Sequence, residues 1–214
     1  MTTTLYLIRH CETVANREHV FQGSLDRPVS VIGQKQLDCL KARFENTHID
    51  GIFSSPYGRA YKTAEAVRGE RDMEIMCIDE VREINGGVYE GTPFVEKLKA
   101  DPVLYDIWNN KPHLFEPQKG ERACEVYSRV KTGIQKIVAM AEGKTVAVTT
   151  HGFALRCILA YLLFDDITRL CDAPIPFNTS VTTVEFYEDG SHKITVADDI
   201  SHLPDELKTS FKSK

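Results

Sequence analysis

Two histidines follow strand-like runs that lie far apart in the chain. His10 comes after the apolar run 4–8 and Arg9, and His151 comes after the run 145–150. In open α/β sheets ligands bind at the carboxyl ends of the strands, so both imidazoles are expected to face one crevice. His151 and the following Gly152 would also start a helix, where free backbone amides favour an anion. The pair therefore predicts an anion site at this edge of a sheet.

Two further charged residues are candidates for the same crevice. Arg59 lies in the first turn of an expected helix, and Glu83 lies in a turn-rich stretch between residues 81 and 87. Taken alone, each has a plainer interpretation, because a helix arginine and a turn carboxylate are usually solvated. Only the whole set, with both histidines and Arg9, makes the functional interpretation specific.

The elements that must position these residues alternate between strand and helix. Pro56, with Ser55 as cap, is the expected start of the second helix. An Asp189-Gly190 turn joins the two strands of a terminal hairpin. This alternation predicts an α/β fold, a three-layer α/β/α sandwich with a largely parallel central sheet. The expected strands are 4–8, 51–54, 74–78, 145–150, 179–187 and 193–197, and the expected helices are 31–45, 56–66, 123–141 and 153–164.

One stretch departs from this alternation. Residues 86–122 hold four prolines and the only tryptophan, with helix-like pieces at 95–100 and 103–108. We expect this stretch to be an insertion that folds over one edge of the core as a small helical lid, within a single domain spanning 1–214. The polar tail after Pro204 is expected to fray.

Composition excludes several classes of protein. The chain of 214 residues is 42% hydrophobic and 27% charged, as in ordinary globular proteins, and its net charge of −5 disfavours a nucleic-acid or anionic-membrane partner. It shows no membrane-spanning run and no secretory signal, and its six cysteines are scattered, so we expect reduced thiols in a cytoplasmic protein. The oligomeric state is left open, with the terminal hairpin edge as a candidate surface for a homodimer.

Taken in order, the chemistry-bearing stretches resemble those of the histidine phosphatase superfamily, in its phosphoglycerate-mutase-like group. The resemblance covers nearly the whole chain and rests on four motifs in sequence, each of them weak alone. The four motifs are Leu7-Ile8-Arg9-His10-Cys11-Glu12-Thr13 with Asn16, Ser54-Ser55-Pro56 with Arg59, Arg82-Glu83, and Val148-Thr149-Thr150-His151-Gly152. The loop after the first motif, Phe21-Gln22-Gly23, also resembles the family.

The resemblance implies a role for each matching residue. His10 would be the nucleophile that forms a phosphohistidine, and Glu83 the proton donor to the leaving group. The residues implied to bind the phosphoryl group or the substrate are Arg9, Arg59, His151, Asn16, Gln22, Gly23 and Gly152. Two guanidiniums and a protonated imidazole would stabilise the phosphoryl charge, so no metal and no cofactor is expected. The partner is then a small phosphate ester.

Two departures from the family pattern and two alternatives stay open. Cys11 stands where the family usually has glycine, so its side chain either crowds the loop or points away from it. Arg122 replaces a common serine and is expected to face solvent. A phosphatase is favoured, because 86–122 has no dense basic patch. The alternatives are a 2,3-bisphosphoglycerate-dependent phosphoglycerate mutase and a non-catalytic phosphate-ester binding module. The natural substrate is left open, with Phe21 and Trp108 as expected parts of its wall.

Overall fold

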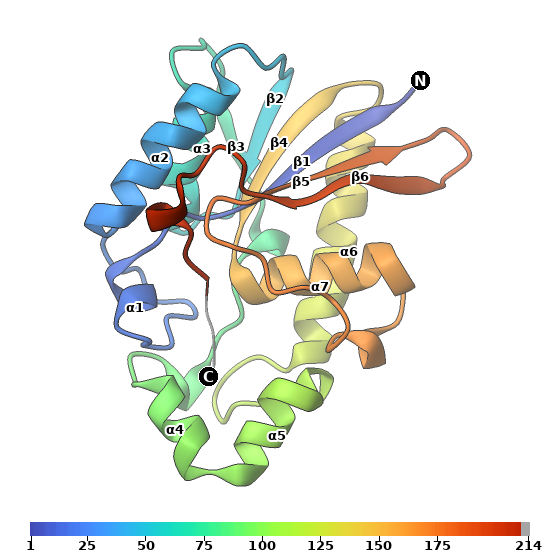
Figure 1. Cartoon of the computed structure of the whole chain (residues 1–214). Helices are drawn as coiled ribbons and strands as arrows, with labels where there is room; N and C mark the ends of the chain where they lie inside the picture. Colours follow the sequence, from blue (N-terminus) through green and yellow to red (C-terminus); the bar gives the residue numbers. More distant parts are fainter. Residues whose placement is uncertain (211–214) are drawn as a thin grey trace.

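The strands of the computed structural model form one six-stranded sheet, and the structure describes residues 1–210. The strand order is β3-β2-β4-β1-β5-β6, in which β1 to β4 pair in parallel and β5 adds an antiparallel pairing on each side. The expected largely parallel sheet is confirmed (Figure 1). The strands are β1 Thr3–Arg9, β2 Gly51–Ser54, β3 Ile75–Cys77, β4 Thr145–Thr150, β5 Val181–Phe186 and β6 His192–Asp199.

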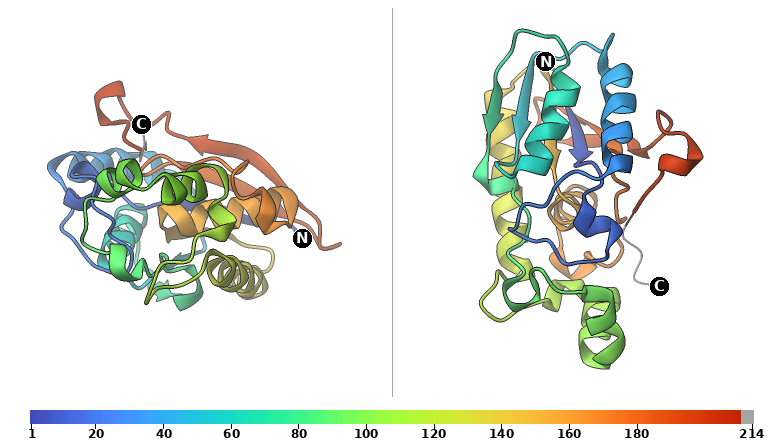
Figure 2. Two further views of the ribbon diagram at one scale, coloured as in Figure 1. Left: turned by 90° about the horizontal axis from the view of Figure 1, so that it is seen from below. Right: turned by 90° about the vertical axis from the view of Figure 1, so that its left-hand side faces the viewer.

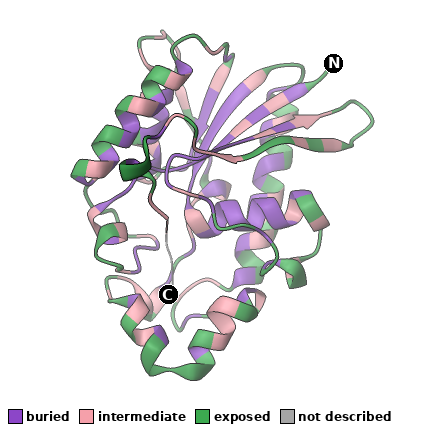
Figure 3. Ribbon diagram, in the orientation of Figure 1, coloured by how far each residue is buried: buried purple, intermediate pink, exposed green. Residues whose placement is uncertain are grey.

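Helices cover both faces of the sheet, because successive strand side chains point to opposite sides. Leu5 and Leu7 belong to a large core cluster with residues of α6 and α7, whereas Ile8 belongs to a second cluster with residues of α2 and α3. Figure 3 shows the buried residues concentrated in the central strands and in α7. Within residues 1–210, no helix is long and apolar enough to cross a membrane. The four helices that cover the sheet are α2 Val31–Phe44, α3 Gly58–Arg68, α6 Ala123–Met140 and α7 Gly152–Phe164.

The register of the two central strands places the two histidines side by side. Arg9 of β1 lies opposite Thr150 of β4, and the His10 backbone N–H donates to the Thr150 carbonyl at 2.9 Å. The next residue of each strand is a histidine, and the ring centroids of His10 and His151 are 5.2 Å apart. Residues 141 positions apart in the chain therefore meet at the carboxyl ends of neighbouring parallel strands.

The helix after β2 begins later than the sequence indicates. The expected start at Pro56, capped by Ser55, is wrong: α3 begins at Gly58, and its N-cap residue Tyr57 provides no side-chain hydrogen bond. Ser55 instead prolongs the sheet, because its N–H donates to the Thr149 carbonyl at 2.9 Å. The cap comes from a distant loop, where the Asp26 carboxylate accepts from the Gly58 N–H at 2.8 Å.

The 86–122 segment lies beyond the carboxyl ends of the parallel strands. It contains α4 Phe94–Ala100 and α5 Pro102–Asn110, close to the predicted helical pieces, and both helices lie apart from the layers that cover the sheet (Figure 2). Its aromatic side chains join the main core, since Phe94 packs edge-on against Phe21 and Trp108 at centroid distances of 4.7 and 4.8 Å. The segment thus connects to the rest of the protein through aromatic rings.

The polar tail is held against the body as far as residue 210. Leu207 is buried, and its carbonyl accepts from the Gln36 side-chain amide at 2.7 Å. The Thr209 carbonyl accepts from the Asn178 N–H at 2.9 Å. The expectation that the chain frays after Pro204 is therefore wrong for residues 205–210, and the last four residues lie outside the described part.

Candidate active site

One cavity opens at the carboxyl ends of β1 and β4, and most of the predicted site residues line it. Its wall also includes Phe21 and Trp108, which were expected there from the sequence. The cavity has a volume of about 100 Å³. His151 is the one predicted residue outside this lining, and it lies directly behind His10. The predicted residues in the lining are Arg9, His10, Asn16, Gln22, Gly23, Arg59, Glu83 and Gly152.

His10 is buried and held in one tautomer. Its Nδ1 lies 2.6 Å from the carbonyl oxygen of Cys11, which can only accept, so Nδ1 carries the proton. The lone pair of the neutral ring is then on Nε2. Burial, together with the charges of Arg59 and Arg9, lowers the pKa of His10 well below its usual value. The ring is therefore a neutral imidazole over the physiological pH range.

Two buried guanidiniums flank His10. Arg9 donates through Nη1 to the Pro176 carbonyl at 2.6 Å, and burial lowers its pKa to about 10, where it is still protonated near neutral pH. Arg59 donates through Nη2 to the Gly23 carbonyl at 2.7 Å and through Nη1 to the Leu25 carbonyl at 2.9 Å. The Nε atom of each arginine is buried and has no hydrogen-bond partner. Backbone carbonyls thus hold both side chains in place, and at least the Nε–H of each remains available to a ligand.

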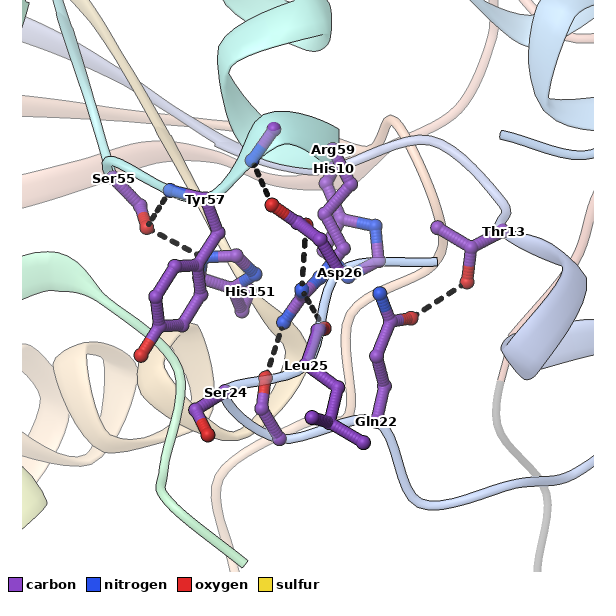
Figure 4. A network of polar contacts seen from close by, with 12 residues as sticks. His10, Thr13, Gln22, Ser24, Leu25, Asp26, Ser55, Tyr57, Arg59 and His151 are labelled. Atoms are coloured by element: carbon purple, nitrogen blue, oxygen red, sulfur yellow. Dashed lines mark hydrogen bonds and ion pairs between the residues drawn. The ribbon is translucent and has the colours of Figure 1, made fainter. Parts of the chain in front are cut away.

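His151 is fixed by a serine that the sequence analysis assigned to a helix cap. Its Nε2 lies 2.7 Å from the Ser55 Oγ, while its Nδ1 is buried without a partner (Figure 4). Burial and the neighbouring charge of Arg59 lower its pKa well below the usual value. Burial therefore disfavours the protonated His151 that was expected from the sequence, and a neutral ring offers a single donor.

Glu83 is anchored at the start of α7. Its carboxylate accepts from the backbone N–H groups of Phe153 at 3.1 Å and Ala154 at 3.0 Å. It also accepts from the N–H of Ile84 at 3.0 Å. Two of these three donors are free amides of the first turn of a helix, which carry partial positive charge. The carboxyl group is therefore held in a fixed position on the cavity wall, on a different element from His10.

The four predicted binding residues reach the cavity for different reasons. The Gln22 Oε1 accepts from the Thr13 hydroxyl at 2.7 Å, and its Nε2 is buried and unpartnered. Asn16 forms a capping box with Thr13 around the short helix α1 (Val14–Arg17). Gly23 has φ +54, a left-handed conformation that suits glycine. At Gly152 an added Cβ would lie 3.4 Å from the Arg9 guanidinium, so glycine permits this close approach.

Sequence comparison identifies the family to which the chain belongs. A sequence profile of the histidine phosphatase superfamily, branch 1, matches residues 5–199. The chain belongs to this superfamily. The matched region contains every site residue described above, from Arg9 to Gly152.

Relatives within the histidine phosphatase superfamily include a phosphatase and a mutase. Phosphoserine phosphatase 1 of Hydrogenobacter thermophilus is 32% identical over 165 residues, which cover 77% of this chain and 78% of the relative. Bacillus stearothermophilus YhfR is 38% identical, with a TM-score of 0.87, and covers 94% of this chain and 98% of its own. Phosphoglycerate mutase of Bacillus anthracis is 25% identical, with a TM-score of 0.80, and covers 94% and 95%. The protein is therefore an enzyme of the phosphoric monoester hydrolase type.

The two departures from the superfamily pattern have structural explanations. The Cys11 side chain is fully buried, and burial raises the pKa of its thiol to about 11, so the thiol is protonated and unreactive near neutral pH. Its N–H donates to the Thr63 Oγ1 at 3.1 Å, which holds the loop behind His10. Arg122 is half-exposed and pairs with Glu125, which confirms that it faces solvent.

Three residues at the site escaped the sequence analysis. Ser55 orients His151, and Asp26 forms an ion pair with Arg59 at 3.3 Å. In the sequence Ser55 is recognisable only as a helix cap and as part of a matching stretch, and Asp26 has no expected role, because each acts through a contact between distant segments. Arg156 lines the cavity from α7. It did have a signal, since it is the only charged residue in an otherwise apolar helix.

Proposed function

We propose that this enzyme hydrolyses small phosphate monoesters through a phosphohistidine formed at Nε2 of His10, without a metal ion. The observation that carries the proposal is a set of buried nitrogen atoms around His10 that have no hydrogen-bond partner. A buried donor without a partner costs about 1–3 kcal/mol, and phosphoryl oxygens would satisfy all of them. The atoms are Arg9 Nε, Gln22 Nε2, Arg59 Nε and His151 Nδ1.

The proposed reaction has two steps at one phosphorus atom. Glu83 enters the first step as the neutral carboxylic acid. The Nε2 lone pair of His10 forms a bond to phosphorus while the ester P–O bond breaks, and the Glu83 acid gives its proton to the departing oxygen. In the second step Glu83 takes a proton from water, the water oxygen attacks phosphorus, and the P–N bond breaks. Inorganic phosphate leaves, and His10 and Glu83 return to their starting states.

The positive charge needed by the phosphoryl group comes from side chains in this proposal. Arg9 and Arg59 are charged, fixed and separated from bulk water, so their electrostatic effect is stronger than at the surface. Within residues 1–210 no group of three His, Cys, Asp or Glu side chains is arranged to hold a metal ion. The two fixed guanidiniums support chemistry in which the protein itself supplies the positive charge.

The mutase alternative requires a different cavity wall. A mutase must bind the second phosphate of a bisphosphate firmly and keep water from the phosphorylated histidine. The 86–122 segment contributes Phe94 and Trp108 to the lining, which are aromatic rather than basic. A phosphatase is therefore favoured. The complete set of reactive residues also speaks against a non-catalytic binding module.

The proposal is tested by trapping the intermediate. A ³²P-labelled aryl phosphate, quenched within a turnover in the presence of EDTA, should leave an acid-labile, alkali-stable label on the wild-type protein. His48→Ala, which changes an exposed histidine, should keep the label, and His10→Ala should lose both the label and turnover. A label that persists in His10→Ala, or that appears only when a metal is restored, contradicts the proposal.

A further inference from the structure

Arg156 is a buried charge in an apolar helix. Only 7% of its surface is exposed, and every other side chain between residues 152 and 164 is uncharged. Burying a guanidinium is costly unless an opposite charge or a full set of hydrogen bonds compensates it. The position of this residue therefore requires an explanation beyond the packing of α7.

Its partners in the structure leave the charge uncompensated. Nε donates to the Ala173 carbonyl and Nη2 to the Cys171 carbonyl, each at 3.1 Å, and Nη1 takes part in neither bond. Burial lowers the pKa of Arg156, and the groups that oppose this effect are the thiols of Cys157 and Cys171 rather than carboxylates. The two carbonyl bonds attach the 171–173 loop, but they supply no negative charge.

The location of Arg156 connects it to the reaction site. It lines the same cavity as His10, together with Phe153 and Ile175. It lies four residues after Gly152, so both face the same side of α7, about 6 Å apart along the helix axis. Because Gly152 abuts the Arg9 guanidinium, Arg156 lies about one helical turn from the phosphoryl site.

We infer that Arg156 binds a carboxylate on the substrate, separated from the phosphate by a short apolar group that lies against Phe153 and Ile175. The inference rests on the proposed phosphatase function and adds the class of substrate. The carboxylate would supply the missing negative charge and a hydrogen-bond acceptor for Nη1. Esters whose organic part carries no carboxylate would lose this contact and bind more weakly.

A matched pair of probes separates this role from loop attachment. The probes are 4-carboxyphenyl phosphate and 4-carbamoylphenyl phosphate, which have nearly the same shape and differ in charge. The variants are Arg156→Met, Arg156→Lys and, as a control on the surface nearby, Arg169→Met, whose arginine pairs with Asp172. The readout is the ratio of kcat/KM for the carboxylate probe to kcat/KM for the carboxamide probe, so differences in leaving group cancel between enzymes.

The inference predicts a specific pattern of ratios. Arg156→Met should lower the ratio at least 10-fold, mainly through KM for the carboxylate probe. Arg156→Lys should lower it by a smaller but measurable factor, because a single ammonium replaces the forked guanidinium donors, and Arg169→Met should leave it unchanged. An equal fall for both probes, with the ratio intact, would show that Arg156 only holds the loop and would overturn the inference. If Arg156→Met fails to fold, Arg156→Lys decides, because unequal loss of the two probes supports the inference and equal loss overturns it.

A measurement of probe binding without turnover tests the inference separately from the proposed function. Calorimetry on His10→Ala, with and without Arg156→Lys, measures the affinity for each probe without turnover. Tighter binding of the carboxylate probe that depends on Arg156 supports the inference even if neither probe is hydrolysed, in which case only the proposed function fails. Equal affinities for the two probes in His10→Ala would overturn the inference.

Discussion

Ser55 and His151 form a contact that sets the chemistry of the imidazole, with the Ser55 Oγ 2.7 Å from the His151 Nε2. The same oxygen accepts from the Tyr57 N–H at 3.3 Å, so its own hydrogen is free to point at His151. Donation from serine to Nε2 places the ring proton of neutral His151 on Nδ1, the buried atom without a partner. Ser55 therefore determines which nitrogen of His151 can donate to a phosphoryl oxygen.

Ser55→Ala should weaken turnover by releasing this tautomer. One hydrogen bond of about 0.5–1.5 kcal/mol is lost, so kcat/KM should fall by up to about 10-fold. Ser54→Ala is the matched control, because Ser54 is equally buried but its hydroxyl does not contact the imidazole. The Ser54 Oγ instead accepts a hydrogen bond from the Thr149 hydroxyl at 2.9 Å. A similar fall in both variants would assign the effect to the strand rather than to His151.

Glu83→Gln should reduce kcat by roughly 10²–10⁴-fold for alkyl phosphates, because an amide cannot donate the required proton. Aryl phosphates with good leaving groups should lose less in the phosphorylation step. The amide has one acceptor oxygen where the carboxylate has two, so part of its anchorage at α7 is also lost. Thermal unfolding of the variant measures that structural part. Equal loss for both substrate types, with phosphorylation rate-limiting, contradicts the acid role.

The buried histidines predict an acid limit to stability. The pKa of His10 and that of His151 are both lowered well below 6.5, so below about pH 6.5 the unfolded chain binds protons that the native protein does not. The free energy of unfolding should then fall as the pH drops, by up to about 1.4 kcal/mol per pH unit for each histidine. Urea titrations at several pH values between about 5 and 7.5 give the free energy of unfolding at each pH. This free energy should depend less steeply on pH in His10→Ala than in the wild type. An unchanged slope would mean that His10 does not contribute.

Phosphorus NMR of a single reaction separates phosphatase from mutase. With 3-phosphoglycerate and added 2,3-bisphosphoglycerate, inorganic phosphate should form faster than 2-phosphoglycerate. We expect this because the 86–122 segment lines the cavity with Phe94 and Trp108, which are aromatic, and not with basic side chains that could hold a second phosphate. O-phosphoserine belongs in the same panel, since a relative is named for it. Rapid isomer exchange with little free phosphate would identify a mutase instead.

The sequence was sufficient to predict those site residues whose positions depend only on the register of the strands. His10 and His151 each follow a strand with a clear apolar pattern, and parallel pairing of those strands is sufficient to bring them together. The same patterns located every strand and the two short helices α4 and α5 to within a few residues. The lid role of the 86–122 segment and the pairing of two chains through the terminal hairpin stay predictions.

Contacts between distant segments account for what the sequence did not predict. Pro56 has the local signature of a helix start, but Ser55 remains in the sheet because Thr149 accepts its N–H. The tail after Pro204 is polar, and its attachment depends on the buried amide of Gln36, which shows no local signal. The neutral state of His151 follows from complete burial, which residue type alone does not indicate.

The position of β1 in the sheet has a consequence for biosynthesis. This strand is synthesised before the other five, yet its two neighbours in the sheet are β4 and β5, the fourth and fifth strands in chain order. Until residue 150 has been synthesised, Leu5, Leu7 and Ile8 lack both of the strand partners of β1, and until residue 186 they still lack one. A nascent chain therefore carries an unpaired apolar strand through most of its translation, a hazard for aggregation. The juxtaposition of His10 and His151 can form only after β4 has paired with β1, so catalytic activity reports this long-range pairing.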